Sequence, residues 1–303
     1  VSNAGTRLAG FGHRWLPFAD AASADLSLPR LLRLSLFQLS TGMAIVLLTG
    51  TLNRIMVVEL GQPASWVSLM LAIPLLMAPA RALIGYRSDH HRSFLGWRRI
   101  PYLWSGTMMQ FGGLAFMPFA LILMTESHSG PELLGPAAAM ASFLLTGLGM
   151  HVAQTAGLAL ATDLATEETR PRVVALLYLM LLIGMVGSAL IFAALLEDFG
   201  YVRLIQVIQS AAVITLVLNV VAMLKQEARR PDLTDHALAR PTFGNAWRDF
   251  ISLPKARPLL WALGLGTMGF TMQDILLEPY GAQVLGLSVS DTTLLTAMFA
   301  GGM

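Results

Sequence analysis

The side chains best suited to chemistry gather inside one long apolar run, on a single helical face. His151, Gln154 and Thr155 follow i, i+3, i+4 spacing, with Gly147 one turn earlier. Polar groups in hydrocarbon are costly and usually have a function. A neutral imidazole there can ligate a metal through one nitrogen while its other N–H meets an acceptor. The same face can instead line a polar cavity, or His151 can simply form a hydrogen bond between packed helices.

Polar residues in neighbouring runs suggest two further sites. Gln38 and Gln110 can line a cavity with the His151 face. Arg54 lies near the outer end of the first run, and Asp274 and Glu278 lie near the outer end of the seventh. We hypothesise that Arg54 pairs with one of these acids and closes the cavity outward, because an unpaired arginine there would cost about 2–3 kcal/mol. The alternative is that each side chain reaches the lipid headgroups by itself.

The sequence predicts no enzyme and no metal centre built from protein ligands. It lacks a glycine-rich phosphate loop, an H-E-x-x-H pair and a Ser–His–Asp set in a credible setting. His90 and His91 follow Asp89, but a solvated turn is the simpler interpretation of that group. The absence of cysteine excludes disulfides and thiolate chemistry. The charge distribution gives no sign of nucleic-acid binding.

The elements that position these residues are membrane helices. Hydrophobic residues make up 55% of the chain and charged residues 13%, with a mean hydropathy of +0.64, whereas soluble domains carry about 25% charged residues. Backbone polar groups cannot stay unpaired in lipid, so apolar runs of about 20 residues must be helices. We therefore predict an all-α polytopic membrane protein. Its full spans are 31–55, 64–86, 100–124, 134–162, 173–196, 203–224 and 258–282, and an eighth begins near 290.

Basic residues set the expected orientation. The N-terminal segment and the connections after spans two, four and six hold 17 of the 20 Lys and Arg residues. The positive-inside rule places these segments, including the N-terminus, in the cytoplasm. The predicted organisation is a cytoplasmic N-terminal segment, a six-helix bundle, a cytoplasmic linker and the start of a second bundle, over residues 1–30, 31–224, 225–257 and 258–303. We interpret the chain as a fragment that lacks later spans.

The long connection 225–257 can form a short helix lying on the membrane. Its residues Phe243, Trp247, Phe250 and Ile251 share one helical face. The alternative is a linker whose aromatic residues have no common role.

The second connection resembles a loop of the major facilitator superfamily, usually written G-x-x-x-D-R-x-G-R-R. Gly85-x-x-x-Asp89 is followed by Gly96-Trp97-Arg98-Arg99, with the second glycine four residues late. The resemblance implies two six-helix bundles, about twelve spans in all, with spans one and seven facing each other. It also implies that Asp89 lies at a helix N-terminus of the other bundle and binds an arginine. The residues of this expected cytoplasmic latch are Gly85, Asp89, Arg98, Arg99, Arg170 and Arg172, although the last two can equally belong to a solvated turn.

Longer segments resemble the PucC/LhaA family, also called the bacteriochlorophyll delivery family. They read GTLNRIMVVELG, RALIGYRSDHHRSFLGWRRIPY, QFGGLAFMPFAL and ATDLATEETRPRVVALLYLMLLIGM. The resemblance implies a protein of the bacterial inner or intracytoplasmic photosynthetic membrane that helps to assemble light-harvesting complexes. Its expected partners are antenna polypeptides and pigment-synthesis enzymes, and its expected ligand is bacteriochlorophyll.

On that interpretation His151 would ligate the pigment magnesium, and Gly147, Gly149 and Gly157 would leave room for the flat macrocycle. Two other functions stay open, a secondary transporter and a porphyrin or lipid flippase. Proton coupling would need an acidic residue exposed to both sides of the membrane in turn, and the only candidates, Asp274 and Glu278, are expected near the outer surface.

Overall fold

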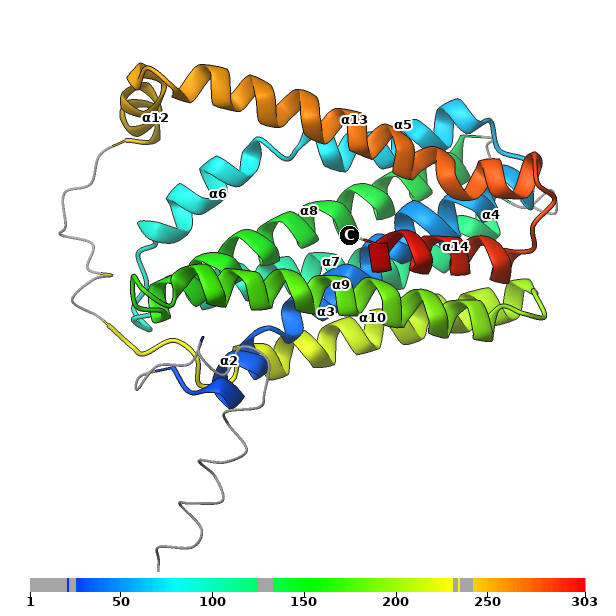
Figure 1. The fold of residues 1–303 in the computed structure, drawn as a ribbon. Coiled ribbons are helices and arrows are strands. Elements are labelled where there is room, and N and C mark those ends of the chain that lie inside the picture. The colour runs from blue at the N-terminus through cyan, green and yellow to red at the C-terminus, as the bar shows by residue number, and fades with distance from the viewer. Residues whose placement is uncertain (1–20, 22–25, 125–132, 231–233, 235–241, 303) are drawn as a thin grey trace, which may run out of the picture.

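The computed structural model describes residues 21, 26–124, 133–230, 234 and 242–302, and these residues form a bundle of long helices joined by short turns (Figure 1). Six helices in this described part are long and apolar enough to cross a membrane. The predicted all-helical, multi-pass class is therefore confirmed.

The first span lies at the centre of the bundle. It runs from Leu28 to Val58 as α2 (Leu28–Leu34), α3 (Leu36–Ile45), the π-helical η2 (Val46–Leu52) and α4 (Asn53–Val58). Of its apolar window 72% is buried, against 22% for the second span, because helices surround it on several sides. The π-helical turn adds a residue to the helix and shifts the side chains after it around the axis.

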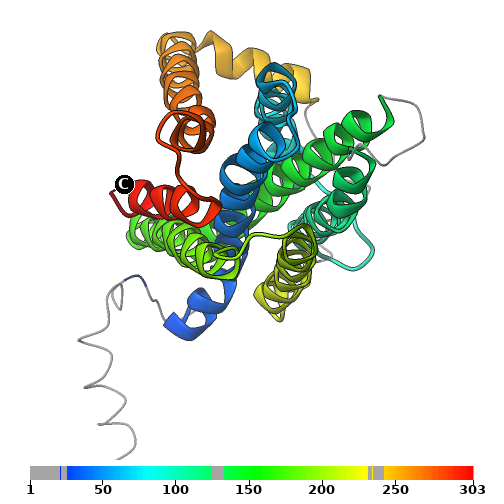
Figure 2. The same ribbon diagram turned by 90° about the vertical axis from the view of Figure 1, so that its right-hand side faces the viewer.

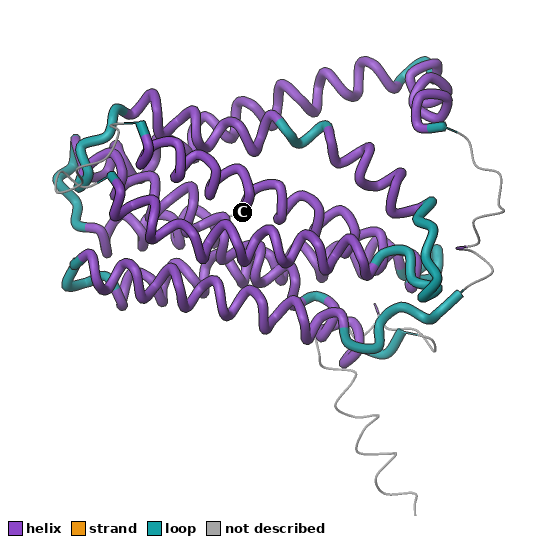
Figure 3. Tube along the Cα trace, turned by 180° about the vertical axis from the view of Figure 1, so that it is seen from behind, coloured by secondary structure: helices purple, strands orange, loops and turns teal. Residues whose placement is uncertain are grey.

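The second span is broken in the middle. Helix α5 (Ala64–Leu76) and helix α6 (Ala80–Asp89) are separated by Met77–Pro79, which Figure 3 shows as a loop. Pro79 has no N–H to donate to Leu75, and its ring disfavours a helical residue before it. The chain instead forms tight turns, in which the N–H of Ala78 donates to the Leu75 carbonyl at 2.9 Å.

The next four spans complete the first bundle. They are α7 (Ile100–Leu123), α8 (Leu134–Leu164), α9 (Arg170–Leu195) and α10 (Tyr201–Met223). Helices α7 and α8 approach at backbone contact, because Gly106, Gly113 and Gly149 lie between them. A Cβ atom on Gly149 would come within 2.7 Å of the Gly106 carbonyl oxygen. Small residues allow such close packing in membranes.

The remaining helices are α12 (Phe243–Ser252), α13 (Ala256–Gln283) and α14 (Val289–Gly302). Helix α14 lies against α9, and α13 runs beside η2 and α4 (Figures 1 and 2). The predicted helix in the linker is present, and Thr242 caps it by accepting the N–H of Asn245. Helix α13 matches the predicted run 258–282. It is not among the six helices apolar enough to cross, because it carries several glycines and polar residues. Its crossing, like the superfamily assignment, stays a prediction.

Candidate functional site

The predicted polar face of α8 packs against the break in the second span. His151 Nε2 lies 3.0 Å from the carbonyl oxygen of Pro74. Because that oxygen can only accept, Nε2 carries the proton and Nδ1 is left as a bare acceptor. Nδ1 is buried and has no hydrogen-bond partner among the described residues. The tautomer of this histidine is therefore fixed by a backbone carbonyl.

Two neighbours of His151 tie the same face to other helices. Gln154 Nε2 donates to Gln38 Oε1 at 3.1 Å, which joins α8 to α3. Thr155 donates to the His151 carbonyl at 2.7 Å and accepts from Arg81 Nε at 3.1 Å. The structure thus brings Gln38 to the predicted face. It also brings Arg81 to this face. Arg81 was not predicted to belong to the site, although its place inside an apolar run could have indicated it.

Gln110 belongs to a separate polar layer. Its Nε2 donates to the Ser40 carbonyl at 3.4 Å, and the Ser40 hydroxyl donates to Asn219 Oδ1 at 2.6 Å. This layer joins α7, α3 and α10, and the side-chain hydrogen bond of Gln110 goes to Ser40 rather than to His151, Gln154 or Thr155.

The expectation that glycines leave room for a macrocycle beside His151 is wrong. A Cβ atom on Gly147 would overlap the Pro74 ring, with Cγ at 2.8 Å. One on Gly149 would come within 2.9 Å of Gln110 Cα, and one on Gly157 would come within 2.7 Å of the Phe37 ring. These glycines permit close helix packing, so the space that they leave is already filled.

The outer contact between the first and seventh spans differs from the expected ion pair. Arg54 Nη1 lies 2.7 Å from Glu59 Oε1, about one turn away on its own span, and Nη2 donates to the Leu287 carbonyl at 3.4 Å. Glu278 lies near the end of α13, as expected, and is fully buried among side chains. The Thr296 hydroxyl donates to Glu278 Oε1 at 2.5 Å, while Oε2 is unpartnered among the described residues.

The carboxylate of Glu278 packs against the Cα of Gly50 in η2. The side chain of Asp274 lies outside the described residues, so that half of the proposed gate stays a prediction.

A backbone hydrogen bond also joins these two spans. Pro279 has no N–H, so the carbonyl of Ile275 lacks its usual helical donor. The side-chain amide of Asn53 donates to that carbonyl at 2.7 Å and to the Thr49 carbonyl at 3.0 Å. The first and seventh spans therefore lie side by side, as the superfamily resemblance implied.

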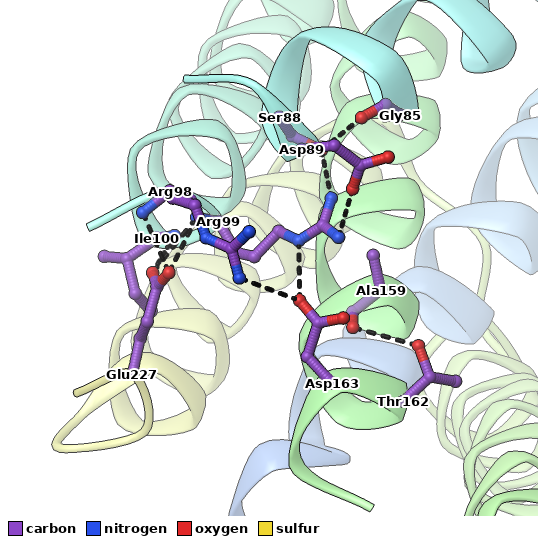
Figure 4. A network of polar contacts seen from close by, with 10 residues as sticks. All are labelled: Gly85, Ser88, Asp89, Arg98, Arg99, Ile100, Ala159, Thr162, Asp163 and Glu227. Carbon is purple, nitrogen blue, oxygen red and sulfur yellow. Dashed lines mark hydrogen bonds and ion pairs between the residues drawn. The ribbon is translucent and has the colours of Figure 1, made fainter. Parts of the chain in front are cut away.

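A charged cluster joins three helices at the end of the bundle predicted to be cytoplasmic (Figure 4). Arg99 is buried, pairs with Asp89 and with Asp163 (Nε to Oδ2, 3.1 Å), and donates to the Ser88 hydroxyl at 2.7 Å. Ser88 in turn donates to the Gly85 carbonyl at 2.9 Å. One guanidinium thereby links α6 and α8 to the start of α7.

Glu227 occupies the N-terminus of α7. Its carboxylate accepts the backbone N–H groups of Arg98, Arg99 and Ile100 at 2.8–3.1 Å (Figure 4). A carboxylate is favoured there by the unpaired N–H groups and the helix dipole. Asp89 ends α6 and binds Arg99 within the same bundle. The arginine partner that the resemblance implied for Asp89 is Arg99, and its expected place at a helix N-terminus of the other bundle stays a prediction.

Three other members of the expected latch make weaker contacts or remain untested. Arg98 Nη2 lies 3.7 Å from Asp163 Oδ2. Arg170 and Arg172 begin α9, and their part in a latch stays a prediction.

The described residues hold no group of three His, Asp or Glu side chains that could bind a free metal ion. His151 offers one nitrogen lone pair. A metal bound there would have to arrive with its other ligands, as it does in a macrocycle.

The chain matches known proteins over most of its length. The profile of the family described as "PUCC protein" matches residues 51–303. The chain is 58% identical to "Protein PucC" of Rhodovulum sulfidophilum and 54% identical to "Protein PucC" of Rhodobacter capsulatus, over 98% and 97% of its own length. It is 28% identical, over 90% of its length, to the "Bacteriochlorophyll synthase 44.5 kDa chain" of Rhodobacter capsulatus.

The chain spans 66%, 65% and 62% of those three relatives. The family profile covers far more than half of this chain, and the helical segments that carried the resemblance lie largely within the matched region. The chain therefore belongs to the PUCC protein family.

Proposed function

We propose that this protein helps to assemble light-harvesting complexes in the membrane of phototrophic bacteria by holding bacteriochlorophyll and shielding antenna polypeptides. The proposal places it in the inner or intracytoplasmic membrane, with the N-terminus in the cytoplasm. Membership of the PUCC family supports the biological setting. The observation that carries the pigment step is His151, an imidazole within a predicted span with one nitrogen bonded and the other without a partner among the described residues.

If bacteriochlorophyll binds here, His151 would hold its magnesium through Nδ1 once the packed helices around it separate. The Pro74 carbonyl keeps the proton on Nε2, so the lone pair on Nδ1 is available at any pH that leaves the ring neutral. When bound, bacteriochlorophyll supplies a magnesium ion with an open coordination position. Protein atoms cover Nδ1, and the neighbouring glycines are packed, so access requires that α5 and α8 separate locally. The helix break at Met77–Pro79 provides a hinge beside Pro74.

A proton-coupled transporter is the second candidate, and one observation favours it. Glu278 is a fully buried carboxyl group among the first, seventh and eighth helical runs, with one oxygen unpartnered among the described residues. A carboxyl group that is alternately buried and hydrated can carry a proton across such a contact. In that function Glu278, and not His151, would be essential.

Complementation separates the two candidates. We expect the protein, expressed in a phototrophic bacterium that lacks its own PUCC proteins, to restore the near-infrared absorption of the antenna. The Glu278→Gln variant should restore it equally well, because it preserves the shape of the side chain. Antenna absorption that stays absent, together with solute uptake into vesicles that depends on a proton gradient and is lost on Glu278→Gln, would establish transport instead.

A further inference from the structure

A groove at the predicted cytoplasmic end of the bundle has no part in the sites above. It lies between the start of α7 and the end of α10, has a volume of about 420 Å³, and is open on one side. Trp97, Trp104, Val220 and Leu224 give it an apolar and aromatic wall. Tryptophan is typical of the boundary between hydrocarbon and headgroups. A groove of this volume is in the size range of sites for single small molecules.

One exposed cation lines the groove, and a second lies over one of its tryptophans. Lys225 lines the groove and is exposed, and Arg229 places its guanidinium 5.1 Å from the centre of the Trp97 ring. Neither cation makes an ion pair within the described part of the chain. The one acid in the lining, Glu227, is already bound by three backbone N–H groups of α7. The charge of the groove is therefore complementary to an anion.

The backbone at Lys225 is unusual. Lys225 has a φ of 53°, and the other described residues with positive φ are Gly61, Gly96 and Gly286. Glycine adopts this left-handed conformation readily at the end of a helix, whereas a residue with a Cβ does so at a cost. The turn itself is needed, because it directs Gln226 toward Arg30, to whose carbonyl it donates at 3.2 Å.

A lysine is not the residue that this turn favours. A basic residue anywhere in the last turn of α10 could interact with the helix dipole, and it would not need the unfavourable φ. The dipole therefore does not explain a lysine at this position. A residue kept in a strained conformation points to a role for its side chain.

We propose that this groove binds one acidic phospholipid from the leaflet on the side of the Arg99 cluster. Its phosphate lies between Lys225 and Arg229, and an acyl chain lies along Trp104 and Val220. Basic pockets between membrane helices bind anionic headgroups in this way. The site would hold a lipid of the photosynthetic membrane against the faces of α7 and α10 that line the groove. It is independent of pigment binding at His151.

Lys225→Gly tests the proposal, because it should weaken lipid binding without destabilising the fold. We expect the purified protein in mild detergent to bind phosphatidylglycerol more tightly than phosphatidylcholine with the same acyl chains, as measured by native mass spectrometry. Lys225→Gly should weaken phosphatidylglycerol binding about fivefold. It should also raise the unfolding temperature by about 2 °C, since glycine suits the positive φ. Lys225→Arg should retain the lipid.

The matched control is Lys255→Ala, which removes an exposed lysine outside the groove and should leave lipid binding unchanged. Soluble glycerol phosphate should bind far more weakly than the lipid, because it lacks the acyl chain. Equal binding of the two lipids, no loss on Lys225→Gly, an equal loss on Lys255→Ala, or a co-purified polypeptide segment in the groove would each overturn the proposal.

Discussion

Gly113→Ala is expected to lower the free energy of unfolding by about 3 kcal/mol, whereas Gly112→Ala should be neutral or slightly stabilising. A Cβ atom on Gly113 would come within 2.6 Å of the Thr146 nitrogen and 2.8 Å of the Ser142 carbonyl oxygen, both backbone atoms of α8. The same atom on Gly112 would lie 3.6 Å from the tip of Leu145, an ordinary contact. Because backbone atoms cannot move aside, α7 and α8 would have to separate.

Thermal unfolding in detergent, with size-exclusion chromatography as a check of the folded fraction, measures this difference. The two glycines are adjacent in sequence, so effects on expression and helix propensity are matched. Equal unfolding temperatures for the two variants would contradict the close approach of α7 and α8.

Arg99→Ala should destabilise the protein by about 2–3 kcal/mol, and Arg98→Ala by less than about 1 kcal/mol. The Arg99 side chain is 6% exposed and is shared by two carboxylates and the Ser88 hydroxyl. Its removal leaves Asp89 without its cation and leaves Asp163 with only the longer contact to Arg98. Those acids are 47% and 39% exposed, so water limits the cost to less than that of a fully buried pair. Arg98 makes a single, longer ion pair at 3.7 Å and is 28% exposed.

Denaturant unfolding of both variants gives the comparison. Asp163→Asn should recover part of the loss when combined with Arg99→Ala, because it removes one of the two carboxylates that had shared the Arg99 guanidinium. Equal effects of the two arginine variants, or no recovery in the double variant, would show that Arg99 does not hold the cluster together.

Periodicity and composition predicted the helices well, because hydrocarbon allows few alternatives. The runs found in the sequence match the helices of the described chain to within a few residues. Two departures had local causes. Pro74 and Pro79 stand five residues apart in the second run, and that pair was a readable sign of the break. The π-helical turn at Val46–Leu52 had no comparable sign, because it depends on how the span packs against α13 and α14.

The candidate site was less predictable, because it depends on partners that the sequence does not mark. The face of His151, Gln154 and Thr155 followed from helical spacing. Its acceptor, a backbone carbonyl at Pro74, could not be found from residue types. Gly147 and Gly157 were misinterpreted because a glycine fits both an open cavity and a close helix contact.

The ionic contacts were also hard to predict, because their partners lie far apart in the sequence. No residue pattern marked Glu227 as the carboxylate that binds the N-terminus of α7. Glu227 lies 128 residues from Arg99, and the fold alone brings the two together.

The absorbance spectrum of the protein purified from a pigmented phototrophic host tests the central claim most directly. We expect bacteriochlorophyll in a stoichiometric amount, its loss on His151→Leu, and its retention on His90→Leu. The His151→Leu variant should still fold, because the N–H of Met77 already donates to the Pro74 carbonyl at 3.1 Å, and an unchanged unfolding temperature would verify this. A colourless protein, or the same pigment content in a folded His151→Leu variant, would contradict the assignment of His151 as the pigment ligand.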